Sequence, residues 1–154
     1  MPAGSRFSGM SGETLTLGFV CVQNAGRSQM SAAFARHERS QRGLDGEVEI
    51  LTGGTDPADE VHPEVVEAMN ELGIDLSDRT PQTVSDEELN NCTVVATMGC
   101  STLDLDADVT VRDWALDDPH GQSIDDVRAI RDDIQGRVAA LFDEYVDELS
   151  AADS

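Results

Sequence analysis

A cysteine and an arginine stand six positions apart where an apolar segment gives way to one with helical spacing. Cys21 lies near the end of the apolar run Leu15 to Val22, and Arg27 and Ser28 open the next segment. A turn from a strand to a helix can direct several backbone N–H groups at one centre, where the helix dipole adds positive potential. That field favours a thiolate, and a guanidinium can hold a tetrahedral oxyanion through two donors. The spacing therefore predicts a nucleophile at Cys21 and an oxyanion-binding group at Arg27.

The residues between these two complete the predicted site. Asn24 tolerates positive φ and can shape the loop from within, and the Ser28 hydroxyl can donate a hydrogen bond to the thiolate. A cysteine at the end of a buried strand can also be an inert small hydrophobe, but burial alone would not require a glycine, an arginine and a helix-opening serine after it. The predicted oxyanion-binding loop consists of Val22, Gln23, Asn24, Ala25, Gly26, Arg27 and Ser28.

Alternating strand and helix patterns follow along the chain. Strands are predicted over 14–22, 47–51, 93–98 and 109–114, and helices over 27–42, 62–72, 85–90 and 123–149. Such alternation favours a parallel sheet with helices on both faces, in which ligands gather at the carboxyl ends of the strands. The sequence thus predicts an α/β fold, a three-layer αβα sandwich around four parallel strands, in a single domain over 13–150 after a flexible lead over 1–12.

Charge is the second unusual property of the chain. Its 154 residues contain 31 acidic and 10 basic side chains, a net charge of −21, and every basic residue is an arginine. This balance argues against a nucleic-acid or acidic-membrane partner. At molar ionic strength the Debye length falls to about 3 Å, which screens the repulsion between carboxylates, so the net charge suggests a cytoplasm rich in salt. A solvated acidic face that binds no partner fits the composition as well. With no apolar segment of membrane-spanning length and no signal-peptide pattern, a cytoplasmic location is expected.

The motif Cys-x5-Arg-Ser resembles the phosphate loop of the low-molecular-weight protein tyrosine phosphatase superfamily. The version Asn-Ala-Gly-Arg-Ser-Gln-Met is most similar to the arsenate reductase branch, and the resemblance extends from about Leu15 to Leu141. It implies that Asp118, before Pro119, is the general acid that protonates the leaving oxygen, with Asp117 as the fallback. Taken alone, an Asp-Asp-Pro sequence is more often only a turn.

In thioredoxin-coupled arsenate reductases of this superfamily, a second cysteine displaces arsenite and a third takes over the resulting disulfide. The resemblance assigns the second role to Cys100, in Thr97-Met98-Gly99-Cys100. No cysteine follows, so either Cys21 and Cys100 form the disulfide themselves or a small thiol reduces the adduct on Cys21 directly. Cys92 is interpreted as a buried structural residue.

The resemblance therefore predicts an arsenate reductase whose partners are a small oxyanion and either thioredoxin or a low-molecular-weight thiol. A phosphomonoester phosphatase acting through a phosphocysteine is the alternative, and a non-catalytic oxyanion sensor is a third possibility. No metal or organic cofactor is expected, because His37, His62 and His120 show no metal-ligand spacing and Ala32 replaces the glutamate of the potassium site in some relatives. The Asp-Pro loop lacks the aromatic residues that would line a phosphotyrosine slot, which favours a bare oxyanion.

Overall fold

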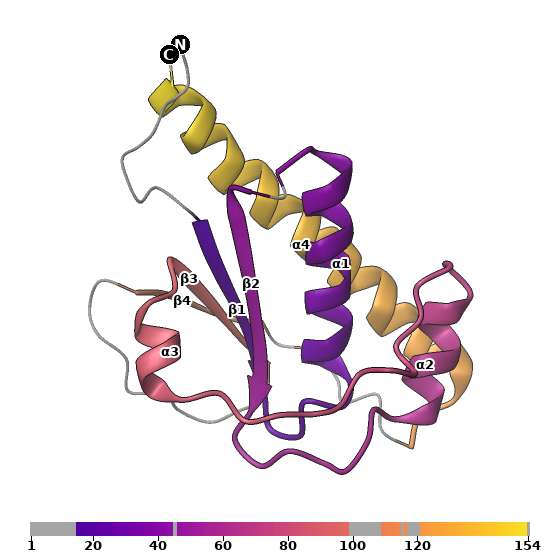
Figure 1. The fold of residues 1–154 in the computed structure, drawn as a ribbon. Helices are drawn as coiled ribbons and strands as arrows, with labels where there is room; N and C mark the ends of the chain where they lie inside the picture. Colours follow the sequence, from indigo (N-terminus) through magenta and orange to yellow (C-terminus); the bar gives the residue numbers. More distant parts are fainter. Residues whose placement is uncertain (1–14, 45, 99–108, 115, 117–120, 154) are drawn as a thin grey trace.

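Four parallel strands form the sheet in a computed structural model that describes residues 15–44, 46–98, 109–114, 116 and 121–153. The strands are β1 (Leu15–Cys21), β2 (Val48–Gly54), β3 (Val94–Met98) and β4 (Thr110–Asp113), in the order β2-β1-β3-β4 (Figure 1). β1 and β3 are apolar and almost wholly buried, as expected for central strands covered on both faces. The predicted parallel sheet is confirmed, whereas the lead over 1–12 lies outside the described residues.

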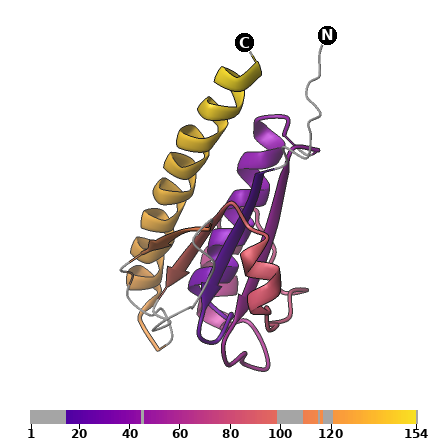
Figure 2. The ribbon, with the colours of Figure 1, turned by 90° about the vertical axis from the view of Figure 1, so that its left-hand side faces the viewer.

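Helices lie on both sides of this sheet. α1 (Arg27–Gln41), α2 (Pro63–Asn70) and the long α4 (Ile124–Asp153) share one side, and the short α3 (Asp86–Asn90) lies on the other (Figures 1 and 2). α3 begins with a capping box, in which the Ser85 hydroxyl accepts from the Glu88 N–H and the Glu88 carboxylate accepts from the Ser85 N–H. The three-layer architecture is therefore confirmed, with one thick and one thin helical layer.

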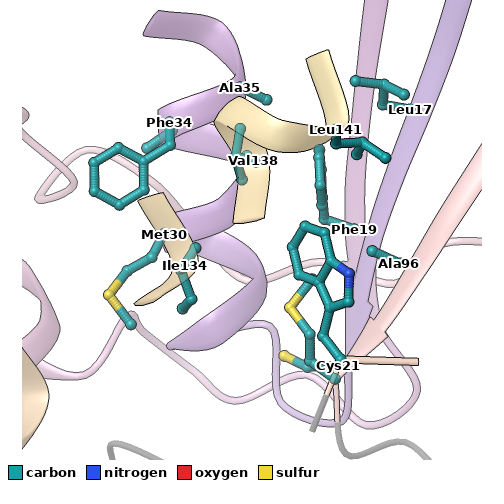
Figure 3. Close-up of a cluster of buried hydrophobic side chains, with 14 of the residues drawn as sticks. Leu17, Phe19, Cys21, Met30, Phe34, Ala35, Ala96, Ile134, Val138 and Leu141 are labelled. Atoms are coloured by element: carbon teal, nitrogen blue, oxygen red, sulfur yellow. The ribbon is translucent and has the colours of Figure 1, made fainter. Parts of the chain in front are cut away.

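The larger core lies between β1 and the helices α1 and α4. Alternate β1 residues Leu17, Phe19 and Cys21 point into it, where Met30 and Phe34 of α1 are fully or almost fully buried (Figure 3). An apolar stripe of α4 is buried as well, at Val127, Ile130, Ile134, Val138 and Leu141. Cys21 is the last of the inward residues, at the carboxyl end of β1, so the reactive candidate is attached to a buried central strand of the sheet.

Two sequence-based expectations are wrong in detail. β2 continues to Gly54 instead of ending at residue 51, because the glycines that suggest a turn pair in register with Val20 and Cys21 of β1. The helix expected over 62–72 is shorter, because α2 ends at Asn70 and Leu72 is 43% exposed in the following turn. Gly73, with φ of +78°, lies at the end of that turn, where glycine readily adopts a positive φ.

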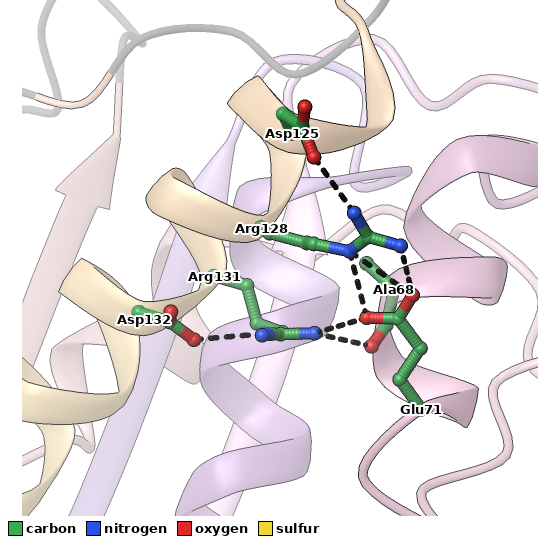
Figure 4. Close-up of polar contacts among 6 residues, drawn as sticks. All are labelled: Ala68, Glu71, Asp125, Arg128, Arg131 and Asp132. Carbon is green, nitrogen blue, oxygen red and sulfur yellow. Dashed lines mark hydrogen bonds and ion pairs between the residues drawn. The ribbon is translucent and has the colours of Figure 1, made fainter.

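α4 is joined to α2 by an arginine–carboxylate network (Figure 4). Glu71 accepts hydrogen bonds from Arg128, at 2.6 Å, and from Arg131, at 2.8 Å. Arg131 is almost buried and also donates to the Ala68 carbonyl, which ties it to the end of α2. The hydrogen bonds from the two guanidinium groups lower the pKa of Glu71 from 4.5 to about 2.

We expect Glu71→Gln to lower the thermal unfolding midpoint at pH 7 by a few degrees. A carboxyl group whose pKa is lower in the folded state contributes stability above its unfolded pKa, and this contribution is lost as the pH falls from about 4.5 towards 2. The difference between parent and variant should therefore narrow between pH 7 and pH 3. Glu67→Gln, on the exposed face of the same helix, is the control. A pH-independent difference would contradict this explanation.

Candidate active site

Cys21 lies at the carboxyl end of the central strand, with neighbours on both sides. It is in register with Gly54 of β2 and with Met98 of β3. The chain then leaves the sheet, makes a loop over residues 22–26 and enters α1 at Arg27. The predicted strand–loop–helix arrangement is therefore present, and the loop sits where parallel sheets bind ligands.

The backbone carbonyl groups of this loop are bonded to the connection between β2 and α2. Four N–H groups of that connection, from Thr55, Asp56, Ala58 and His62, donate to the loop and to the residue directly before it. Their acceptors, in order and at 3.2, 2.8, 2.9 and 2.9 Å, are the carbonyl oxygens of Cys21, Val22, Gln23 and Ala25. Residues 55–62 thus form an outer support for the loop.

These bonds determine which way the loop N–H groups point. In a trans peptide the N–H of one residue is directed opposite to the carbonyl of the residue before it, and none of the described peptide bonds is cis. Carbonyls that face the outer support therefore turn the N–H groups of residues 22, 23, 24 and 26 the other way. The Asn24 N–H shows the result, since it donates to Cys21 Sγ at 3.1 Å.

The Cys21 sulfur has two polar neighbours. Besides the Asn24 N–H, the Ser28 hydroxyl lies 2.8 Å from Sγ, as the sequence led us to expect. The hydroxyl donates to the sulfur when the sulfur is a thiolate. A charge-assisted hydrogen bond of this kind is stronger than a neutral one, and both neighbours are placed to donate to the sulfur.

Asn24 connects the loop to the rest of the fold. Its backbone has φ of +52°, the conformation anticipated from its residue type. Its side-chain Nδ2 donates to the hydroxyls of Ser28 and Thr52, while Oδ1 accepts from the Gln29 side chain and the Gln82 N–H. Both donor and both acceptor positions of this buried amide are therefore satisfied within the protein. Asn24 needs no bound ligand to complete its hydrogen bonds in this loop conformation.

Gly54 permits the close approach of β2 to the loop. A Cβ atom at this position would lie 2.4 Å from the Val22 carbonyl oxygen and 3.0 Å from the Asn24 nitrogen. Both are backbone atoms of the loop and could move only by distorting it. The glycine therefore allows the outer support to begin directly after β2.

Arg27 is half-buried at the start of α1, and its Nη1 donates to the Leu116 carbonyl at 3.0 Å. A guanidinium has five N–H donors, so this contact leaves its fork able to bind an oxyanion. The same contact places Arg27, the first residue of α1, beside the segment that follows β4. Beyond that segment, the Gly121 N–H donates to Glu64 near the start of α2.

The structure brings together Cys21, Arg27 and the loop residues 22–28, but the other predicted catalytic residues, Asp118 and Cys100, lie outside the described residues. So do Asp117 and His120. Their roles remain predictions from the resemblance.

Cys92 does not belong to the site. It is buried on the opposite side of the sheet with Val20, Leu89 and Val95. Burial, with a smaller effect of nearby Glu88, raises its thiol pKa to about 11. It therefore stays a neutral thiol at physiological pH, in agreement with the structural role inferred from the sequence.

Sequence reasoning missed the contribution of His62. No role was expected for it, but it is buried, and its Nε2 lies 3.1 Å from Oε1 of Gln23 in the loop. The only sequence signal was a histidine before Pro63 at the start of a helix. Within the described ranges, no group of three or more His, Cys, Asp or Glu side chains is placed to hold a metal ion, and no described helix is long and apolar enough to cross a membrane.

We expect Ser28→Ala to slow alkylation of Cys21 by iodoacetamide at pH 7 by about tenfold, because the thiolate loses one charge-assisted hydrogen bond. Ser31→Ala is the matched control, since Ser31 is equally buried on α1 but bonds to the Arg27 carbonyl and not to Cys21. Equal alkylation rates for Ser28→Ala and the parent would show that the hydroxyl does not stabilise the thiolate.

Comparison with known proteins agrees with this geometry. A putative arsenate reductase of Halobacterium salinarum is 68% identical over 133 residues, which cover 86% of this chain and 94% of the relative. A thioredoxin-dependent arsenate reductase of Corynebacterium glutamicum has a similar structure, with a TM-score of 0.72 and 30% identity over 87% of this chain and 63% of that one. An arsenate reductase in the phosphate-binding state gives a TM-score of 0.70 at 27% identity, over 85% of this chain and 98% of that chain. The model of the low molecular weight phosphotyrosine protein phosphatase family matches residues 16–151, and the chain belongs to that family.

Proposed function

We propose that this protein is an arsenate reductase in which the Cys21 thiolate attacks arsenate held by the loop N–H groups and Arg27. The observation that carries the proposal is the position of Cys21 Sγ. The sulfur lies on the side of the loop to which the loop N–H groups point, within hydrogen-bonding distance of the Asn24 N–H and the Ser28 hydroxyl. Such donors stabilise negative charge on the bound oxyanion and on the transition state alike, and they need no reorganisation when the reaction begins.

The first step forms a bond between Cys21 Sγ and arsenic and releases one arsenate oxygen. That oxygen leaves as water once it is protonated, and Asp118 is the proposed proton donor. Arsenic is still pentavalent in this adduct, so the step transfers no electrons. The same step with a phosphate ester would give a phosphocysteine and an alcohol.

The second step reduces arsenic. The thiolate of Cys100 attacks Cys21 Sγ, the sulfur–sulfur bond forms, and the sulfur–arsenic bond breaks with its electron pair left on arsenic. Two thiols are oxidised to one disulfide while arsenic becomes trivalent, so the electrons balance. A low-molecular-weight thiol could take the place of Cys100 in the same exchange.

The disulfide must then be reduced by an external thiol. Thioredoxin and a low-molecular-weight thiol both remain candidates, since no third cysteine follows Cys100. The Corynebacterium glutamicum relative is thioredoxin-dependent, which supports a thiol reductant of this general kind. A reduced-thiol supply also fits a cytoplasmic location, and the Halobacterium salinarum relative fits the salt-rich cytoplasm inferred from the net charge of −21.

A phosphomonoester phosphatase is the second candidate, because the family model describes phosphotyrosine phosphatases. The same loop would serve both reactions. Against it stands the sequence after Pro119, where His120 and Gly121 offer no aromatic wall for a phenyl ring. Relatives that are 68% and 33% identical are also named for arsenate reduction.

Replacement of Cys100 separates the two enzymes. We expect Cys100→Ser to reduce arsenate turnover with thioredoxin to the level of Cys21→Ser. Any hydrolysis of p-nitrophenyl phosphate by the parent should survive in Cys100→Ser and be lost in Cys21→Ser. Both assays are run at high potassium chloride, with Cys92→Ser as the control cysteine variant. Ester hydrolysis without any arsenate reduction by the parent would make the protein a phosphatase.

Replacement of Asp118 separates an enzyme from an oxyanion sensor. We expect Asp118→Asn to lower the rate of the first step by about 10²- to 10⁴-fold, because the leaving oxygen loses its proton donor. Affinity for arsenate, measured by calorimetry, should change little. A parent protein that binds arsenate tightly and turns over neither arsenate nor a phosphate ester would instead be a sensor.

A further inference from the structure

His62 occupies the position directly before a helix, where a side chain ordinarily caps the helix by hydrogen bonding to its first N–H groups. It is the N-cap residue of α2, where Ser, Thr, Asp and Asn are preferred because their side chains accept from the first helical N–H groups. The His62 side chain makes no such bond. Its ring instead extends to the loop, where Nε2 lies 3.1 Å from Gln23 Oε1.

We propose that His62 is a positioning residue that holds the Gln23–Ala25 part of the loop in its anion-binding conformation before the oxyanion arrives. The inference rests on the proposed role of the loop and deepens it. Two separate contacts carry it: the His62 N–H donates to the Ala25 carbonyl at 2.9 Å, and the ring, as the Nε2–H tautomer, donates to the Gln23 side chain. They hold the loop on both sides of Asn24.

His62 itself is held by the core. Its carbonyl accepts from the N–H groups of Val65 and Val66, so its backbone is part of the first turn of α2. Pro63 restricts φ at the first helical position, and Val65 and Met69 of the same helix are fully buried. His62 as a whole residue is 8% exposed. A helix anchored in the core therefore holds the ring, and the ring holds Gln23.

The Gln23 side chain explains why such support is useful. Gln23 is exposed, and a free glutamine side chain has many rotamers. Its own carbonyl accepts from the Ala58 N–H, which helps to direct the Asn24 N–H towards Cys21 Sγ. Anchoring both the side chain and the carbonyl of Gln23 reduces the ordering that anion binding would otherwise require.

The test is a double-mutant cycle on phosphate affinity, measured by titration calorimetry at high potassium chloride. We expect His62→Ala and Gln23→Ala each to weaken phosphate binding by about threefold to tenfold, the effect of one hydrogen bond, with little further loss in the double variant. His62→Gln retains an N–H donor and should restore much of the affinity. His37→Ala, on the exposed face of α1, is the control.

A purely structural role would give a different pattern. In that case His62→Ala would lower the unfolding midpoint, and its effect would be independent of the Gln23→Ala change. It would also raise KM and lower kcat together, whereas a positioning role predicts a higher KM alone. Phosphate binding that is unchanged in His62→Ala and Gln23→Ala, or effects of the two that simply add, would overturn the role of His62. A parent protein that binds no phosphate would overturn the proposed function of the loop as well as this inference.

Discussion

The active-site loop depends on where its carbonyl groups are bonded. Three of them, and the carbonyl of Cys21 directly before the loop, accept from the segment between β2 and α2, and this leaves the following N–H groups on the side of the cysteine sulfur. A loop without that outer support would have to satisfy the same carbonyls with water and would sample many conformations. The support fixes the direction of the donors without any charged side chain.

The fold supplies this support through a short sequence of contacts. β2 pairs with β1 as far as Cys21, so the chain leaving β2 starts beside the loop. Gly54 lets the two backbones approach, and the connection then runs along the loop to the start of α2. Because β1 and α2 both contribute to the same buried core, the proposed nucleophile and its support are attached to one hydrophobic cluster.

The sequence predicted the parts of the site whose chemistry resides in side chains. The cysteine, the arginine, the serine contact and the unusual backbone of Asn24 follow from residue types and their spacing. The outer support over residues 55–62 could not be predicted, because it acts through backbone N–H groups. Almost every residue has such a group, so no residue type in the sequence indicates which of them form these hydrogen bonds. The Gly53-Gly54 pair was misleading for a related reason: two glycines indicate a turn, whereas here they extend a strand against a neighbouring backbone.

A chain with a net charge of −21 must still attract an anion, and the distribution of its arginines bears on how it does so. Several guanidinium groups face carboxylates, as in the pairs of Arg42, Arg112, Arg128 and Arg131. Arg27 instead donates to a neutral carbonyl, so that contact does not neutralise its charge. At molar salt the repulsion from distant carboxylates is screened within about 3 Å, whereas direct hydrogen bonds to an anion persist. In the proposed site, oxyanion binding by so acidic a protein would therefore rely on direct contact donors, the loop N–H groups and one guanidinium, and would not need an extended basic surface.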